Sequence, residues 1–281
     1  TIDSVGNIFA GAEDGMFKST NYGTTWLETG DSLKKTWITS VVITTNGTIY
    51  ASTMSNGIFR STSGGAEWSK VFSLSASSLA ANSLSHVFAC RFSFGLYRST
   101  DAGDSWMNIN KGIADSSVRT VAVTAGGEVI AGTQTGIFVS SDNGQTWTYT
   151  LNGFIQSIGV SPLGQVYSSV FAGARYSAIY RSLDNGLSWM NIVTLPPVGA
   201  FGFNSAGHIF VGTQGGFADG VYKSSDNGTT WSEINSGLGQ VYVTSVAVNS
   251  SDFVFAAVQA GYVYKSTQRT TSVEEVDNTV P

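Results

Sequence analysis

The sequence predicts an all-β protein, a single β-propeller built from four-stranded antiparallel blades. The first observation is an eight-residue pattern, SSDNGTTW from Ser224, which returns in six good copies along the chain. The second is its spacing, because the tryptophans that end the copies lie 42, 38, 41, 42 and 42 residues apart, a period typical of propeller blades. The third is composition. Only 12% of residues are charged, with 33 Gly and 4 Pro, which favours short strands and tight turns over helices.

The repeated pattern has a physical explanation that rests on its residues alone. Asp, Asn or Ser at the third place can accept hydrogen bonds from backbone N–H groups, and the Gly two residues later can adopt a positive φ. Together they predict a tight turn between two strands. The Trp that follows begins the next strand, where we expect its ring to be buried between neighbouring repeats. The pattern starts at Ser224 and also at the following residues: Ser19, Ser61, Ser99, Ser140 and Ser182.

Each repeat can be divided into four strands. In the fourth, residues 116–124 are the expected inner strand, VIAGT the second, IFVSS the third and TWTYTL the outer strand. Four strands in about 41 residues leave no room for a helix. The repeats are expected near residues 2–33, 36–73, 78–110, 116–151, 155–195, 198–235 and 242–276.

The number of blades depends on the last repeat. It keeps only a trace of the pattern, KSTQ from Lys265, without the Gly and the Trp. We expect seven blades, with six as the alternative. Residues 1–269 are assigned to the propeller. Residues 270–281 supply the outer strand of the last blade, at about 270–276, or a linker to a further C-terminal domain, or both.

The pattern S-x-D-x-G-x-T-W resembles the Asp-box, or BNR repeat, of sialidase-like β-propellers. This resemblance implies that the turns form one rim as scaffold, and that ligands bind on the opposite face. The implied structural residues are Ser19, Asn21, Gly23, Trp26, Ser61, Gly65, Trp68, Ser99, Asp101, Gly103, Trp106, Ser140, Asp142, Gly144, Trp147, Ser182, Asp184, Gly186, Trp189, Ser224, Asp226, Gly228 and Trp231.

A cation precedes the pattern in six of the seven repeats, so we expect a structural role for it, such as covering a neighbouring ring with its alkyl stem. These residues are Lys18, Arg60, Arg98, Arg181, Lys223 and Lys265. His86 and His208 share a place after the inner turn, where we expect solvent-facing turn residues, and no metal site is predicted. Cys90 is expected to be a small buried hydrophobe. No cofactor is expected.

The net charge and the hydropathy of the sequence argue against nucleic acid and the membrane interior as partners. The net charge is −5 and no Lys/Arg cluster occurs, which argues against nucleic-acid binding. No apolar run approaches the roughly 20 residues of a membrane helix, so membrane insertion is not expected. The final TTSVEEVDNTVP is similar to the segment before the sorting domain of proteins exported by the type IX route in Bacteroidetes and relatives. That similarity implies a secreted or cell-surface protein, with a monomeric propeller inside a larger exported chain.

The candidate ligand residues break the repeat in the loops between second and third strands and in the crossings between blades. Arg can grip a carboxylate with two hydrogen bonds, and aromatic rings can stack on sugars or anchor a protein. The candidates are Arg91, Phe92, Phe94, Arg119, Phe154, Arg175, Tyr176, Phe217 and Tyr242.

Three functions fit this pattern. The favoured one is a secreted, non-catalytic binding module for a glycan or protein ligand. The alternative is a glycoside hydrolase of sialidase or xyloglucanase type, implied by the resemblance, which needs two facing carboxylates. The carboxylates available for it are Glu13, Asp14, Asp115 and Asp219. The Arg-Ile-Pro start of sialidases is absent, and a xyloglucanase forms its cleft from two propellers. The third is an architectural repeat of a surface protein.

Overall fold

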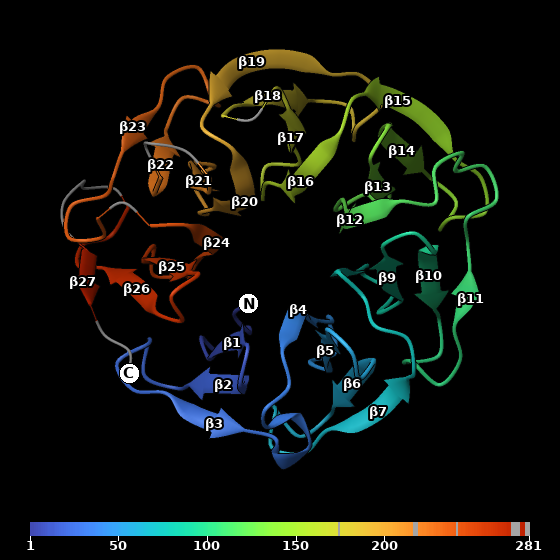
Figure 1. Cartoon of the computed structure of the whole chain (residues 1–281), viewed down its shortest axis with the longest axis horizontal. Helices are drawn as coiled ribbons and strands as arrows, with labels where there is room; N and C mark the ends of the chain where they lie inside the picture. The colour runs from blue at the N-terminus through green and yellow to red at the C-terminus, as the bar shows by residue number, and fades with distance from the viewer. Residues whose placement is uncertain (174, 216–218, 240, 271–275, 279–281) are drawn as a thin grey trace. The chain divides into compact units, whose positions relative to one another are not determined.

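The computed structural model confirms the all-β class and the seven-bladed β-propeller fold. It describes residues 1–281 except 174, 216–218, 240, 271–275 and 279–281. For 276–278 it describes the backbone and not the side chains. Seven antiparallel sheets follow one another along the chain, six with four strands and the first with three (Figure 1). In the described part of the chain the only helix is a single 3-10 turn, Asp31–Leu33.

The strands are short and follow the predicted order of inner, second, third and outer strand. In the first three sheets they are β1 (Ile8–Ala12), β2 (Gly15–Ser19), β3 (Leu27–Thr29); β4 (Ile38–Ile43), β5 (Ile49–Thr53), β6 (Ile58–Ser61), β7 (Ser69–Phe72); and β8 (Ser78–Ala81), β9 (Val87–Arg91), β10 (Gly95–Ser99), β11 (Met107–Asn108). In the next two they are β12 (Val118–Val123), β13 (Val129–Thr133), β14 (Gly136–Ser140), β15 (Thr148–Asn152); and β16 (Ile155–Val160), β17 (Val166–Phe171), β18 (Ser177–Ser182), β19 (Met190–Leu195). The last two contain β20 (Val198–Phe203), β21 (Ile209–Thr213), β22 (Val221–Ser224), β23 (Ser232–Glu233); and β24 (Val243–Val248), β25 (Val254–Val258), β26 (Val263–Ser266), β27 (Val276–Asn278).

The first and last sheets depart from the regular pattern. In the first, the inner strand expected at Ile2 is reduced to one bridge between Ile2 and Ile8. In the last, β27 pairs with Tyr264–Ser266 and supplies the fourth strand. Of the outer strand expected at 270–276, the structure describes Thr270, whose N–H donates to the Asp252 carbonyl at 2.8 Å, and Val276, the first residue of β27; residues 271–275 lie outside the described part.

The chain divides into two compact units. The first contains residues 1–22 and 26–154, and the second contains residues 23–25 and 155–281. Within the first unit, β4 packs beside β1, β8 beside β4 and β12 beside β8. Within the second unit, β20 packs beside β16 and β24 beside β20. Each unit is therefore a series of sheets whose inner strands are neighbours.

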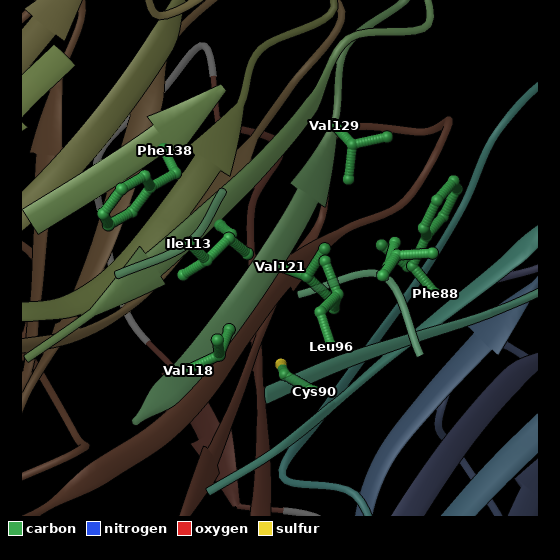
Figure 2. Close-up of a cluster of buried hydrophobic side chains, with 11 residues drawn as sticks. Phe88, Cys90, Leu96, Ile113, Val118, Val121, Val129 and Phe138 are labelled. Carbon is green, nitrogen blue, oxygen red and sulfur yellow. The ribbon is translucent and has the colours of Figure 1, made fainter. Parts of the chain in front are cut away.

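Buried apolar side chains from successive sheets form the core. Figure 2 shows one such cluster in the first unit, where Phe88, Cys90 and Leu96 of the third sheet meet Val121 and Val129 of the fourth. These side chains alternate along their strands, as expected for sheets packed face to face. Burial raises the pKa of the Cys90 thiol to about 12, so this residue is the buried hydrophobe that the sequence predicts.

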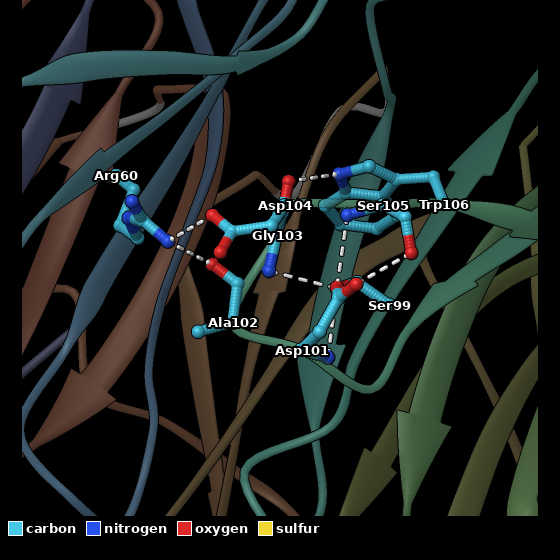
Figure 3. A network of polar contacts seen from close by, with 8 residues as sticks. All are labelled: Arg60, Ser99, Asp101, Ala102, Gly103, Asp104, Ser105 and Trp106. Atoms are coloured by element: carbon cyan, nitrogen blue, oxygen red, sulfur yellow. Dashed lines mark hydrogen bonds and ion pairs between the residues drawn. The ribbon is translucent and has the colours of Figure 1, made fainter.

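The repeated eight-residue pattern forms a closed turn between the third and outer strands (Figure 3). The Ser99 hydroxyl accepts a hydrogen bond from the Gly103 N–H at 2.7 Å and donates one to Asp101 at 2.8 Å. Asp101 also accepts bonds from the N–H and hydroxyl of Ser105. Gly103 has φ +93°, a conformation that L side chains rarely adopt. The turn is thus stabilised almost entirely by its own residues.

The carboxylates in these turns are strongly acidic. Hydrogen bonds from the following Ser or Thr lower the pKa of Asp101, Asp142 and Asp226 to about 2. The tryptophan that ends the turn is also paired, since the Trp106 indole N–H donates to the Gly103 carbonyl at 3.1 Å. The other indoles with the same kind of backbone bond are those of Trp68, Trp147, Trp189 and Trp231.

Several of the cations before the turns connect to the next sheet. Arg60 donates to the Ala102 carbonyl at 2.7 Å and pairs with Asp104 at 2.9 Å (Figure 3). Arg98 bonds the carbonyl of Asn143 in the same way, and the Lys18 ammonium donates to Gly64. The structural role is thus a hydrogen bond to the neighbouring turn. Beside this bond, the Lys18 ammonium lies 5.3 Å from the centroid of the Phe9 ring, while cover of a ring by the alkyl stem stays a prediction.

Candidate functional site

The end of each sheet opposite the repeated turns is formed by the loop between its second and third strands and by the residue that precedes its inner strand. We call this the loop end. Backbone hydrogen bonds hold the two parts together, from Met54 N–H to the Trp37 carbonyl at 2.9 Å and from Gln259 N–H to the Tyr242 carbonyl at 3.0 Å. The side chains at the loop ends therefore stand on fixed backbone.

Arg91 and Phe94 form a stacked pair at the loop end of the third sheet. Arg91 is the last residue of β9, and Phe94 lies in the tight turn before β10, where the Phe94 N–H bonds the Arg91 carbonyl at 2.9 Å. The Arg91 guanidinium carbon lies 3.6 Å from the centroid of the Phe94 ring. Asn110 donates to the Phe94 carbonyl at 2.9 Å and so fixes the turn from the outer side.

Arg119 owes its position to a β-bulge. The register of β12 against β13 shifts between Val118 and Thr120, so Arg119 is the extra residue of the bulge. Bulges re-aim a side chain relative to the sheet, and here the guanidinium carbon lies 4.8 Å from the Phe154 ring centroid and 5.4 Å from that of Phe92. Three segments of the first unit thus supply one surface, the β9–β10 loop, the bulge in β12 and Phe154 after β15.

We call this surface the Arg–Phe cluster; its members are Arg91, Phe92, Phe94, Arg119 and Phe154. Phe92 and Phe94 are 46% and 52% exposed. Among the described residues, no carboxylate lies within ion-pair distance of Arg91 or Arg119. A guanidinium stacked on a ring keeps its N–H donors free at its edge. The cluster therefore presents two cations without counter-ions, on a chain whose net charge is −5.

The remaining predicted ligand residues belong to the second unit. Arg175 and Tyr176 are exposed in the loop between β17 and β18. Tyr242 is exposed directly before β24. Phe217 lies outside the described residues. The structure thus brings five of the nine predicted residues into one cluster and puts three in a separate unit.

The carboxylates considered for hydrolysis have different surroundings. Asp115 accepts hydrogen bonds from the Ser117 N–H at 2.8 Å and from the Thr135 N–H and hydroxyl at 3.1 and 3.2 Å. Burial raises its pKa, but these hydrogen bonds together outweigh burial and hold the pKa below its ordinary value. A general acid needs the opposite shift. Asp115 connects the crossing before β12 to the β13–β14 loop.

The other three carboxylates lie in two other segments, the β1–β2 turn and the stretch between β21 and β22. Glu13 and Asp14 are exposed in the turn between β1 and β2, where the Asp14 carbonyl accepts a bond from the Lys35 N–H at 2.7 Å. Asp219 is buried in the second unit. Over the part of the chain that the structure describes, no three His, Cys, Asp or Glu side chains form a group that could hold a metal ion. His86 and His208 are half-buried, and each lies beside an asparagine of its own turn.

Trp37 is an exposed aromatic residue at the loop end of the second sheet that the predicted ligand set omits. Trp37 precedes β4 and is 48% exposed. A sequence signal for it exists, because the other six of the chain's 7 tryptophans end the repeated pattern and Trp37 does not. The repeated pattern gives six tryptophans a role in the scaffold, and it gives Trp37 none.

The comparisons with known proteins show the fold and not a family. No protein-family model and no curated protein matches the sequence. Among solved structures, the GH74 xyloglucanase from Xanthomonas campestris aligns with a TM-score of 0.75 at 14% identity, over 93% of this chain and 50% of the xyloglucanase. The extracellular domain of a hybrid two-component system from B. thetaiotaomicron gives 0.74 at 14% identity, over 94% of this chain and 37% of its own. YCF48 bound to D1 peptide gives 0.69 at 18% identity, over 91% and 87%.

The sequence identities and the shares of each chain that are covered limit these comparisons to the fold. The chain spans half the length of the xyloglucanase and a smaller share of the sensor domain. At such identities the shared property is the propeller fold, which carries many different activities. Among the described residues, no helix has the length and apolar character needed to cross a membrane.

Proposed function

We propose that this chain is a non-catalytic binding module that recognises a carboxylate-bearing ligand at the Arg–Phe cluster. The observation that carries the proposal is the pair of guanidinium groups that lie over the exposed Phe94 and Phe92 rings without a carboxylate partner among the described residues. Over the described part of the chain, these two cations form no ion pair that would stabilise the fold. A ligand carboxylate can accept two parallel hydrogen bonds from such a group.

The surrounding rings give the same site an apolar component. Phe92 and Phe94 are exposed and lie next to the arginines of the cluster. Aromatic residues and Arg are enriched on surfaces where proteins bind partners. The stacking also holds each guanidinium in place before the ligand arrives, so that little rotamer entropy is lost on binding. An anionic ligand with an apolar face fits both components.

The finer identity of the module belongs to the same proposal. The repeated turns are Asp-boxes with a scaffold role, because their carboxylates are occupied by hydrogen bonds within the turn. The module acts outside the cytoplasm as part of a larger exported or surface protein. This is supported by the likeness to an extracellular sensor domain and by the C-terminal segment that resembles the linker before a type IX sorting domain.

The likeness to a xyloglucanase makes a glycoside hydrolase the second candidate. It needs two carboxylates of opposite role, one of them with a raised pKa. The hydrogen bonds on Asp115 lower its pKa instead, and they tie it to Thr135. The binding module is therefore the better supported function.

The test compares acidic ligands with neutral counterparts. The full chain is titrated on an array of uronic-acid and sialic-acid glycans with their reduced, uncharged analogues, and on peptides with free or amidated C-termini. Arg91→Ala and Arg119→Ala should each weaken binding of the acidic member by about tenfold or more, since a charge-assisted bidentate contact is lost. Lys70→Ala, an exposed cation on β7, is the matched control and should bind as the unmodified chain does.

Two results would contradict the proposal. One is equal affinity for acidic and neutral members of a pair, and the other is unchanged affinity in both arginine variants. Release of cleaved sugar from any bound glycan would favour the hydrolase instead, and would direct mutagenesis to Glu13, Asp14, Asp115 and Asp219.

A further inference from the structure

Trp37 stands apart from the repeated turns, which contain the other six tryptophans of the sequence. Five indoles of the repeated turns donate a hydrogen bond to a backbone carbonyl, at 2.8 to 3.1 Å. Within the described part of the structure, the Trp37 indole N–H has no such partner, and its ring stacks on no other ring. Nearly half of its surface is exposed. Among the described residues, this side chain therefore makes no hydrogen bond and belongs to none of the buried apolar clusters.

The backbone around Trp37 is nevertheless firmly held. Thr36 and Ile38 on either side are buried, and Ile38 pairs with Thr53 at the end of β5. The Lys35 N–H bonds the Asp14 carbonyl at 2.7 Å, and the Trp37 carbonyl accepts the Met54 N–H at 2.9 Å. The exposed ring thus stands on a segment fixed from both sides, as a preorganised binding residue requires.

The loop beside the ring adds a second apolar group and several polar ones. Met54 is 58% exposed, and Ser55 and Asn56 follow it at the surface. The Thr53 hydroxyl accepts the Asn56 N–H at 2.9 Å and donates to the Gly57 carbonyl at 2.8 Å, so the loop is rigid. The Trp37 indole, whose N–H has no partner among the described residues, is thus joined through its backbone to a loop that exposes a thioether, a hydroxyl and an amide.

We propose that Trp37 and Met54 form a stacking subsite for a pyranose ring, which makes the ligand of this module a glycan. The apolar C–H face of a pyranose lies on a flat aromatic surface, while its hydroxyl groups need donors and acceptors at the rim. The indole N–H, Ser55 and Asn56 provide them. A buried apolar anchor of a protein partner would instead fill a desolvated pocket, and the polar rim at Trp37 is a poor match for it.

This inference rests on the proposed function and makes it more specific. Trp37 and the Arg–Phe cluster lie at loop ends of the same unit. A glycan that carries uronic or other acidic sugars satisfies both, with one sugar stacked on Trp37 and a carboxylate at Arg91 or Arg119. The ligand class is therefore an acidic oligosaccharide rather than an acidic peptide.

The experiment measures binding of the full chain and of four variants to an array of acidic and neutral glycans and to acidic peptides. Trp37→Ala should weaken glycan binding by about tenfold, because a stacked sugar ring is lost, and Trp37→Phe should retain part of it. Met107→Ala, which removes an apolar side chain of β11 that is 62% exposed, should leave affinity unchanged. Arg119→Ala reports separately on the carboxylate contact.

The outcomes separate the two proposals. Glycan binding that depends on both Trp37 and Arg119 supports both. Glycan binding that depends on Arg119 but is unchanged in Trp37→Ala overturns the stacking subsite and leaves the proposed function standing. Binding of acidic peptides alone, dependent on Arg119, does the same. Failure of every acidic ligand to bind overturns both proposals.

Discussion

The two ends of the sheets use the same kinds of residue in opposite ways. At the end with the repeated turns, Trp106 donates its indole N–H to a carbonyl, and Arg60 bonds a carbonyl and a carboxylate. At the loop end, the Trp37 indole has no partner among the described residues and Arg119 lies on phenyl rings. These turn-end residues direct their donors to partners within the chain, whereas these loop-end residues leave N–H groups available.

This contrast separates scaffold from recognition without reference to any relative. A polar group that is satisfied inside the turn contributes to stability, and its removal leaves a buried partner without a hydrogen bond. A polar group that is fixed in place but not satisfied contributes little to stability, and its capacity is open to a ligand. Substitutions of the same residue type at the two ends should therefore have opposite effects on stability and binding.

The largest expected difference is between two tryptophans. Trp68 is 7% exposed and its indole bonds the Gly65 carbonyl, so Trp68→Ala should lower the free energy of unfolding by about 3–5 kcal/mol. Trp37→Ala should change it by less than about 0.5 kcal/mol, as for an exposed residue without partners. Chemical denaturation of both variants checks this. A loss of more than about 2 kcal/mol in Trp37→Ala would show that this ring belongs to the scaffold.

A smaller effect is expected from the turn hydroxyls. The Ser140 hydroxyl is buried, accepts the Gly144 N–H at 2.7 Å and donates to Asp142 at 2.7 Å. Ser140→Ala should cost about 1–3 kcal/mol, because a buried N–H loses its acceptor. Ser55→Ala, at an exposed loop-end serine, is the control and should be neutral in thermal unfolding. Equal melting temperatures for the two variants would contradict the scaffold role of the turn.

Substitutions of Arg60 and Arg119 should differ less in their effect on stability than those of the two tryptophans, and more in their effect on ligand binding. Arg60 is partly exposed and bonds Asp104 and the Ala102 carbonyl, so Arg60→Met should lower stability by about 1 kcal/mol or less. Arg119→Met should leave stability unchanged and abolish recognition of acidic ligands. Denaturation and binding assays on both variants decide this, and the comparison fails if Arg60→Met is the variant that loses the ligand.

The smallest effect expected for a single residue is on the pH dependence of the melting temperature. The folded pKa of Asp142 is about 2, below the roughly 3.9 of an unfolded Asp. A depressed pKa contributes stability that is present above pH 4 and is lost as pH falls through about 2. The melting temperature should therefore fall between pH 4 and 2, and Asp142→Asn should make that fall shallower. A variant whose melting temperature has the same pH dependence as the unmodified chain would refute the assignment.

The sequence predicts the turn end well because that end is local. Ser, Asp and Gly within one copy of the pattern satisfy one another, so a stretch of eight residues contains the cause of its own structure. The strand order and the burial of Cys90 follow from the same short-range patterns. Even the cation before the turn was recognisable as structural, although its carbonyl partner in the neighbouring sheet was not.

The loop end is less predictable because its geometry depends on several segments. The aim of Arg119 results from a bulge in β12 and from the positions of Phe92 and Phe154, which come from other loops. Asp115 was a candidate acid in the sequence, and only the fold places Thr135 against it. Trp37 carried a signal through its absence from the repeat, but its missing hydrogen-bond partner is visible only in three dimensions.

The most direct test of the contrast between the two ends is hydrogen–deuterium exchange at the indole N–H groups, followed by NMR without any ligand. The account predicts that Trp37 exchanges much faster than the five indoles bonded to backbone carbonyls, those of Trp68, Trp106, Trp147, Trp189 and Trp231. If Trp37 exchanges as slowly as these five, its N–H is already satisfied within the fold, and the claim that the loop end holds its donors free for a ligand is wrong.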